Sequence, residues 1–158
     1  MMTSLAIGLY ASPGYLERRP APAGLPELAE HDLILAREKL GPTAQLLSAG
    51  GQIEPVALRP AVLAIDFAAV LRHTLVSAGV GQLPILVAAR AVQGGDLVRV
   101  LLGWAAGSGT LRAISLAGRE LPMRVRLFRE HVRGALASRF AVETEPRCSG
   151  AAAAPSHR

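Results

Sequence analysis

Short apolar runs and helical apolar stripes follow one another along most of the chain. Phe67, Val70 and Leu71 fall at i, i+3 and i+4, with Leu75 four positions further on, and this spacing predicts a helix with one buried face. Other apolar stretches are predicted to be strands, because they are short and bounded by Gly, Pro or polar residues. These stretches are "LAIGLY" (5–10), "HDLIL" (31–35), "AQLLSA" (44–49), "IEPVAL" (53–58), "AVLAI" (61–65), "VGQLP" (80–84), "LVRVLL" (97–102) and "TLRAISLA" (110–117). Strands that alternate with helices predict an α/β fold.

Residues suited to helix ends mark the predicted helix boundaries. Ser12 suits a cap and Pro13 suits the first helical position, so a helix is predicted directly after the first strand. Pro26 begins a short helical stretch, and Asp66 caps the helix that follows the strand at 61–65. Gly79 is predicted to close that helix in the left-handed conformation.

The C-terminal part of the chain contains one long predicted helix. The segment "GWAAGSG" (103–109) is predicted to be a loop, and Pro122 opens the final helix. Its apolar stripe consists of Val125, Phe128, Val132 and Leu136. Residues 141–158 show no periodic pattern and few large apolar side chains, which predicts a disordered tail.

Composition adds little to this pattern. The 158 residues carry 17 Lys and Arg against 12 Asp and Glu, a net charge of +5, but the arginines are scattered and aromatic residues make up only 4%. Arg126, Arg129 and Arg133 share one stripe of the last helix, which is typical of a solvated face more than of a nucleic-acid surface. The single Cys148 excludes a disulfide within one chain. With no leader pattern and no long apolar segment, the sequence predicts a cytoplasmic protein.

Candidate chemistry is sparse. The glycine pair in "GVGQLP" follows a helix where a dinucleotide fingerprint needs a strand, and "GWAAGSG" lacks the lysine of a phosphate loop. His31–Asp32 is an adjacent acid–base pair, and His73 and His131 lie on separate predicted helices without ligand spacing. The sequence therefore predicts no catalytic site, metal or cofactor. Asp66 is more suggestive, because ligands of open α/β sheets collect where a strand passes directly into a helix.

Four motifs in order resemble one family. Ala11 to Leu16, Asp66 to Pro84, Gly95 to Trp104 and Leu121 to Phe128 are similar to segments of the effector-binding domain of LysR-type transcriptional regulators, over roughly residues 5–138. The resemblance implies a type II periplasmic-binding-protein fold, present in part. Residues 1–10 would be a crossover strand, 11–96 subdomain II, 97–140 the C-terminal strand and helix of subdomain I, and 141–158 a tail.

The same resemblance implies a function. The chain would sense a small-molecule effector without catalysis, with Asp66 and Phe67 at the ligand cleft and the backbone near Tyr10 and Ser12 at the hinge. The family's winged helix-turn-helix, linker helix and first half of subdomain I are expected to be missing, so direct specific DNA binding is not expected. An alternative is an interaction module or remnant that pairs with a full-length LysR-type regulator or with itself. An enzyme that uses His31, Asp32 and Asp66 is a further alternative.

Overall fold

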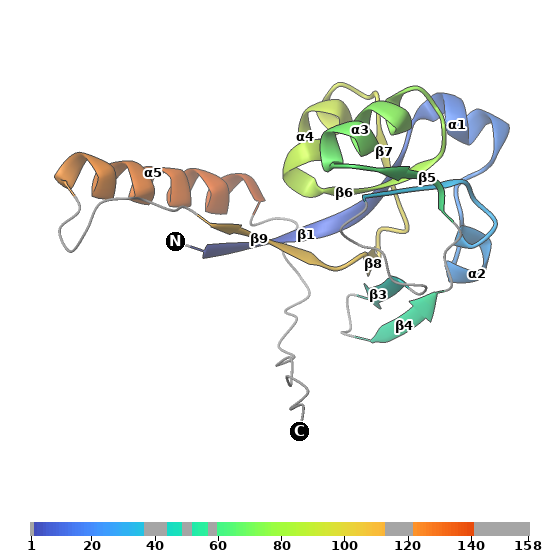
Figure 1. Cartoon of the computed structure of the whole chain (residues 1–158), viewed down its shortest axis with the longest axis horizontal. Coiled ribbons are helices and arrows are strands. Elements are labelled where there is room, and N and C mark those ends of the chain that lie inside the picture. The colour runs from blue at the N-terminus through green and yellow to red at the C-terminus, as the bar shows by residue number, and fades with distance from the viewer. Residues whose placement is uncertain (1, 37–43, 49–51, 57–59, 113–121, 141–158) are drawn as a thin grey trace.

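The computed structural model describes residues 2–36, 44–48, 52–56, 60–112 and 122–140 (Figure 1). Its strands are β1 (Met2–Ala11), β2 (Leu33–Ala36), β3 (Ala44–Ser48), β4 (Ile53–Val56), β5 (Pro60–Ala64), β6 (Val80–Pro84), β7 (Val98–Val100), β8 (Trp104–Ala105) and β9 (Ser108–Arg112). Its helices are α1 (Pro13–Arg18), α2 (Leu25–Leu28), α3 (Phe67–Leu75), α4 (Ile85–Gln93) and α5 (Met123–Phe140). The predicted α/β class is confirmed.

The main sheet has the strand order β5-β2-β6-β1-β7. Strand β2 is parallel to β5 and β6, whereas β1 is antiparallel to both β6 and β7. The parallel strands therefore end at one edge of the sheet, which we call the carboxyl edge and which holds Ala36, Ala64 and Pro84. Because β1 runs the other way, its last residue, Ala11, lies at the opposite edge, which we call the amino edge.

Each face of this sheet is covered by its own hydrophobic cluster. Side chains alternate along β1, so that Leu9 and Ala11 belong to one cluster and Tyr10 to the other. The first cluster includes Tyr15 of α1 and Leu28 of α2. The second includes Val70 of α3, together with alanines of α4. Figure 1 shows α3 and α4 above the sheet and α2 below it, an arrangement of helices on both faces.

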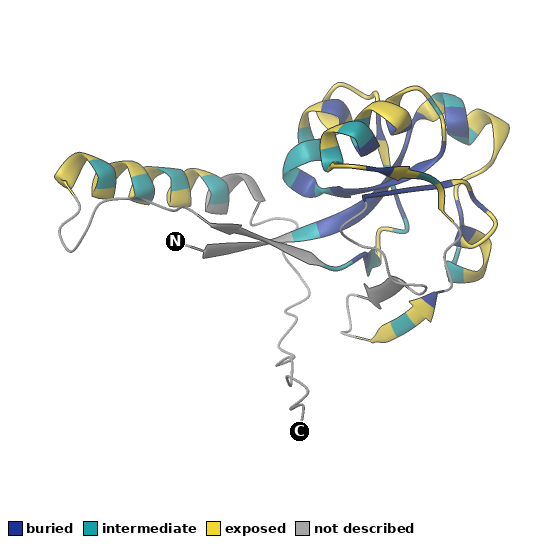
Figure 2. Cartoon of the chain, in the orientation of Figure 1, coloured by how far each residue is buried: buried dark blue, intermediate teal, exposed yellow. Residues whose placement is uncertain are grey.

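A second, smaller part of the structure extends from the main body, which consists of the main sheet and the helices packed on its two faces. The first half of β1 pairs with β9, so that one strand serves both parts, and α5 lies beside this two-stranded ribbon in Figure 1. The chain returns next to β1, where the Ile7 N–H donates to the Gly107 carbonyl at 3.0 Å and the Ala106 N–H donates to the Ile7 carbonyl at 2.7 Å. Figure 2 shows buried positions concentrated in the main body, while the described side chains of α5 are exposed or half-buried.

Three local predictions need correction. Helix α3 ends at Leu75, and the residue in the left-handed region is Ser77, with φ of 62°, instead of Gly79. Gly79 is a glycine for a different reason, because a Cβ there would overlap the carbonyl oxygen of Asp32. The predicted strand 97–102 is shortened to β7 by a turn, and the segment predicted as a loop contains β8 and the start of β9.

Most other predicted elements are confirmed. Ser12 caps α1, since its hydroxyl accepts the Tyr15 N–H at 3.3 Å, with Pro13 at the first helical position. A small antiparallel sheet of order β4-β3-β8 accounts for two of the predicted short strands. The tail predicted at 141–158 and residues 113–117 of the strand predicted at 110–117 lie outside the described residues.

Candidate functional site

The start of α3 lies at the carboxyl edge and is well formed. Asp66 follows β5 almost directly, its backbone is extended, and its carboxylate accepts the Ala69 N–H at 2.8 Å. The carboxylate satisfies one of the free N–H groups of the first turn, and the remaining ones, together with the helix dipole, favour polar or anionic groups nearby. Asp66 itself is exposed, so this end of α3 is accessible from solvent.

Two apolar side chains flank Asp66. Phe67 is half-buried and packs against both hydrophobic clusters, so it lies where the two faces of the sheet meet. Ile65, on the other side, is 76% exposed. The sequence analysis assigned Ile65 to the end of the predicted strand 61–65 and did not include it among the site residues.

The structure does not bring all four predicted site residues together. Tyr10 is 2% exposed and belongs to the cluster under α3 and α4, so its side chain is part of the core. Ser12 lies beyond the amino edge, where its hydroxyl is 2.8 Å from the Ser77 hydroxyl, past the C-terminal end of α3. Because the nine residues of α3 span about 13.5 Å, Asp66 and Ser12 lie at opposite ends of that helix. Only Asp66 and Phe67 share one location.

Gln82 is a polar residue that the sequence analysis passed over. Its side chain is 4% exposed, and its amide donates to the Ala106 carbonyl at 2.7 Å. This bond ties β6 to the segment that returns beside β1. The sequence signal was one polar residue within the otherwise apolar strand "VGQLP".

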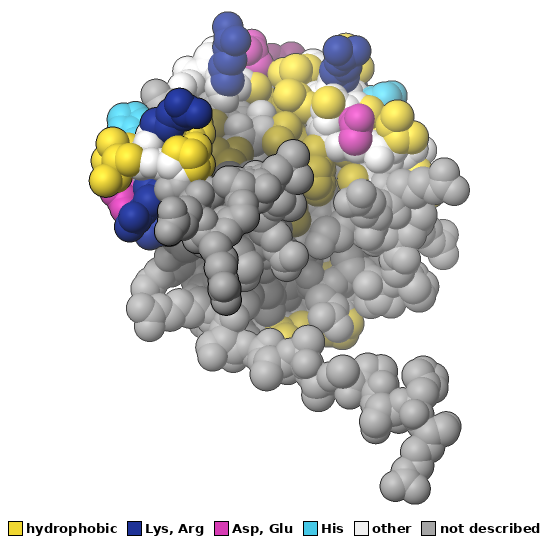
Figure 3. All heavy atoms as spheres, turned by 60° about the vertical axis from the view of Figure 1, so that its left-hand side comes forward, with side chains coloured by type: hydrophobic (Ala, Val, Ile, Leu, Met, Phe, Trp, Pro, Cys, Tyr) yellow, Lys and Arg dark blue, Asp and Glu magenta, His cyan; other side chains and the backbone are white. Residues whose placement is uncertain are grey.

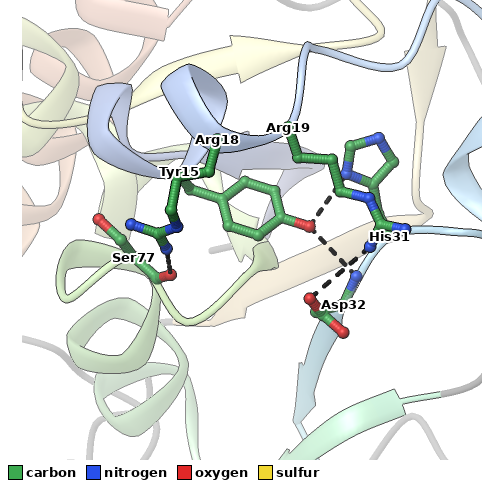
Figure 4. A network of polar contacts seen from close by, with 6 residues as sticks. All are labelled: Tyr15, Arg18, Arg19, His31, Asp32 and Ser77. Carbon is green, nitrogen blue, oxygen red and sulfur yellow. Dashed lines mark hydrogen bonds and ion pairs between the residues drawn. The ribbon is translucent and has the colours of Figure 1, made fainter.

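A polar network lies at the amino edge (Figure 4). The Tyr15 hydroxyl is 3.0 Å from Nδ1 of His31 and accepts the Asp32 N–H at 3.2 Å. The carboxylate of Asp32 is 3.8 Å from the Arg19 guanidinium, while Arg18 donates to the Ser77 carbonyl at 2.8 Å. The network fastens α1 to the start of β2 and to the end of α3.

The contacts of this network join separate elements of the fold. Burial of the His31 ring, with a smaller contribution from the Arg19 charge, lowers its pKa below the usual 6.5. In the tautomer of the neutral ring that carries its proton on Nε2, Nδ1 accepts a hydrogen bond from the Tyr15 O–H, and the Tyr15 oxygen accepts the Asp32 N–H. Asp32 instead points to Arg19, so the predicted acid–base neighbours do not act on a common group. Within the described part of the chain, no three His, Cys, Asp or Glu side chains form a cluster that would hold a metal ion.

The other charged candidates are on the surface. His73 is exposed and its Nδ1 is 2.8 Å from the Ala69 carbonyl oxygen of its own helix. Arg126 and Arg133 are exposed on α5, and Arg129 is half-buried. Figure 3 shows basic and hydrophobic side chains side by side on this exposed helix. His131 lines a hollow of about 740 Å³ between α4 and α5. Of the helices in the described ranges, none is long and apolar enough to cross a membrane.

Comparison with known proteins gives one consistent result. The family model described as the LysR substrate binding domain matches residues 3–137. A curated relative, the HTH-type transcriptional regulator PtxR of Pseudomonas aeruginosa, is 36% identical over 129 residues, which cover 78% of this chain and 39% of PtxR. The chain thus spans less than half the length of the curated relative it matches.

Solved structures show the same fold. The regulatory domain of AphB from Vibrio vulnificus is 24% identical with a TM-score of 0.66, and the match covers 85% of this chain and 68% of that one. The structure of CrgA from Neisseria meningitidis, a LysR-type transcriptional regulator, is 20% identical with a TM-score of 0.67, covering 85% of this chain and 46% of that one. The main body therefore has the periplasmic-binding-protein-like α/β fold of LysR regulatory domains. Since the family model matches most of its length, the chain belongs to the LysR substrate binding domain family.

Proposed function

We propose that this chain is the effector-sensing part of a LysR-type transcriptional regulator, with a small molecule bound at the carboxyl edge of the main sheet. The contacts of this chain are Asp66, Phe67 and the exposed Ile65. The role is binding without catalysis, in the cytoplasm. Tyr10 and Ser12 act through the backbone and the core, not as ligand contacts.

The observation that carries this proposal is the accessible start of α3. Three parallel strands end at this edge, and α3 begins there with free N–H groups and an exposed carboxylate cap. Phe67 and Ile65 add apolar surface beside the polar one. A small acid that carries a hydrogen-bond donor and an apolar or aromatic body suits this combination, because its donor can bond to the Asp66 carboxylate and its own carboxylate can accept from the free N–H groups of the first turn. Its body would contact the two apolar side chains.

The predicted division of the chain supports the same arrangement. Residues 11–96 would form the unit that presents α3, and 97–140 would carry the strand and helix of the second unit. Strand β7 pairs with β1 inside the main sheet, so we place β7 with the first unit and the crossing near Ala106. Residues 1–10 then form the other crossing, within β1.

A thermal-shift screen with small carboxylates and aromatic acids tests this function. Ile65→Glu and Val76→Glu form a matched pair, because both side chains are strongly exposed, at 76% and 74%, but flank opposite ends of α3. With a stabilising acid in hand, Ile65→Glu should weaken its binding about fivefold or more through like-charge repulsion. Val76→Glu should leave the affinity within about twofold, a change worth less than about 0.5 kcal/mol.

Two results would overturn this proposal. One is the absence of stabilisation by any acid in a folded sample, and the other is an equal loss of affinity in the two variants. The triple variant of His31, Asp32 and Asp66 addresses the enzyme hypothesis. Any turnover that the triple variant abolishes would support an enzyme.

A second candidate function, association with another chain, is favoured by α5. Of the predicted stripe, Phe128 is 68% exposed, whereas Val125, Val132 and Leu136 are half-buried. Met123 and Leu127 are also exposed, at 67% and 58%. Burial of one such side chain against a second copy or a LysR-type partner would contribute about 1.5–3 kcal/mol.

Sedimentation equilibrium at high micromolar concentration tests the association. Phe128→Lys should reduce self-association, and Val76→Lys, at an equally exposed position of the main body, should not. A monomer in the unmodified protein contradicts association with itself and leaves the sensing proposal intact.

A further inference from the structure

A second concave site lies on the face of the sheet away from α3. It is lined by Gly24, Leu25, Pro26 and Ala29 of α2 and its flanks, by Glu54, Pro55 and Val56 of β4, and by Trp104 of β8. Its volume of about 560 Å³ falls within the range of small-molecule pockets. Leu28 of α2 and Val56 belong to the cluster opposite the one that contains Val70 of α3. The lining residues of this pocket, which we call the Trp104 pocket, do not include Ile65, Asp66 or Phe67, so it is a separate site from the carboxyl edge.

The walls of the Trp104 pocket are held by the core. Leu25 and Trp104 pack against the first hydrophobic cluster, and Val56 is 8% exposed within it. The backbone of Trp104 is part of a tight turn, in which its backbone N–H donates to the Leu101 carbonyl at 2.8 Å. Leu101 adopts a φ of 52°, a conformation that costs a non-glycine residue energy and that recurs at functional sites. The turn fixes the backbone of Trp104, whose half-buried side chain packs against the first cluster and which lines the pocket.

The charge of the pocket is opposite to that of the chain. Among its described lining residues, Glu54 is the one ionisable side chain, and it is half-buried in a protein whose net charge is +5. The Gln52 amide donates to the Glu54 carboxylate at 3.4 Å, which helps to orient it. Apart from Glu54, the lining side chains are apolar, with prolines that limit rearrangement.

We infer that the Trp104 pocket binds a small organic cation with an apolar body, such as an aromatic or aliphatic amine. The ammonium group would pair with the Glu54 carboxylate and lie against the indole ring, whose face attracts cations more than that of any other side chain. The apolar body would contact Leu25, Pro26 and Pro55. An anion would meet the carboxylate and no compensating cation among the lining residues.

Trp104 is the single tryptophan of the chain, so its indole N–H signal in a ¹⁵N–¹H spectrum reports on this pocket directly. The probe is phenethylamine, compared with its neutral analogue 2-phenylethanol and the anion 3-phenylpropanoate. The amine should move the indole signal to saturation. The alcohol should bind about tenfold more weakly, since the cation–π contact and the charge-assisted bond are lost, and the anion more weakly still.

Two variants separate the role of Glu54 from general effects. Glu54→Gln should weaken the amine about tenfold and leave the alcohol unchanged, whereas Glu17→Gln, at an exposed position of α1, should alter neither. Ala29→Arg places a cation at an exposed position of the wall and should abolish the response to the amine, with folding checked by far-UV circular dichroism. Equal binding of the three probes, an unchanged affinity in Glu54→Gln, or a signal that never saturates would overturn the inference.

Discussion

Replacement of Gly79 by alanine tests a close approach between β6 and the start of β2. The new Cβ would overlap the carbonyl oxygen of Asp32 and lie 2.9 Å from its carbonyl carbon and 3.1 Å from its Cβ. These are backbone or near-backbone atoms, which cannot rotate away as the end of a flexible side chain can. Either β6 moves away from β2, or the backbone of Asp32 shifts.

Each of these movements breaks identifiable contacts. The Asp32 carbonyl accepts the Val80 N–H at 2.8 Å, at the start of the β2–β6 pairing, and the Asp32 N–H donates to the buried Tyr15 hydroxyl. A lost hydrogen bond costs about 0.5–1.5 kcal/mol and overpacking about 1–3 kcal/mol. We therefore expect Gly79→Ala to lower the free energy of unfolding by about 2–4 kcal/mol.

Urea denaturation followed by circular dichroism measures this change. With a slope of about 2 kcal/mol per M, the midpoint should fall by about 1–2 M. Gly103→Ala is the matched control, because a Cβ there would meet nothing within 4 Å, and it should change stability by less than about 0.5 kcal/mol. A loss in Gly79→Ala no larger than in the control would refute the close approach of β6 to Asp32.

Three further predictions concern the His31 ring, the cap of α1 and DNA binding. Since burial lowers the pKa of His31, stability should fall as the pH drops below about 6.5, where the unfolded chain takes up a proton that the folded one does not; His31→Asn should flatten this part of a pH series of urea midpoints, and an unchanged profile would contradict the assignment. Ser12→Ala should lower the free energy of unfolding by about 1–2 kcal/mol in urea titrations, because it removes the cap of α1; a loss below about 0.3 kcal/mol would mean that the hydroxyl does not act as a cap. The isolated chain should bind duplex DNA weakly, with an affinity that falls steeply with salt, and sequence-selective binding in a gel-shift assay would contradict this.

The sequence predicted those elements whose signals are local. Asp66 and Ser12 are caps by residue type, and the structure confirms both. The helical spacing of apolar residues in α3 was also sufficient to predict that the face carrying Val70 is buried. Leu75, the last residue of that apolar stripe, is 39% exposed. Such features depend on neighbours in the chain, which is why composition and spacing were enough.

Features that depend on pairing between distant strands could not be predicted in the same way. Tyr10 pairs with Gly81, and the antiparallel direction of that pairing places Ser12 and Asp66 at opposite edges of the sheet. The prediction that Ser12 and Asp66 share one site did not take into account that β1 runs antiparallel to β6. The requirement for glycine at position 79 also comes from strand pairing, because the atoms that leave no room for a Cβ belong to Asp32, far away in sequence. The left-handed Ser77 was missed because its partners, Ser12 and Arg18, belong to α1 and its flank.

The two crossings between the main body and the ribbon that leads to α5 have a mechanical consequence. Ile7 exchanges two backbone hydrogen bonds with the returning segment at Ala106–Gly107, and Gln82 secures that segment from the side. Two strands bonded edge to edge resist sliding and stretching far more than bending across their plane. We therefore expect the ribbon of β1 and β9 to move relative to the main sheet by bending across the plane of these bonds more readily than by sliding along them.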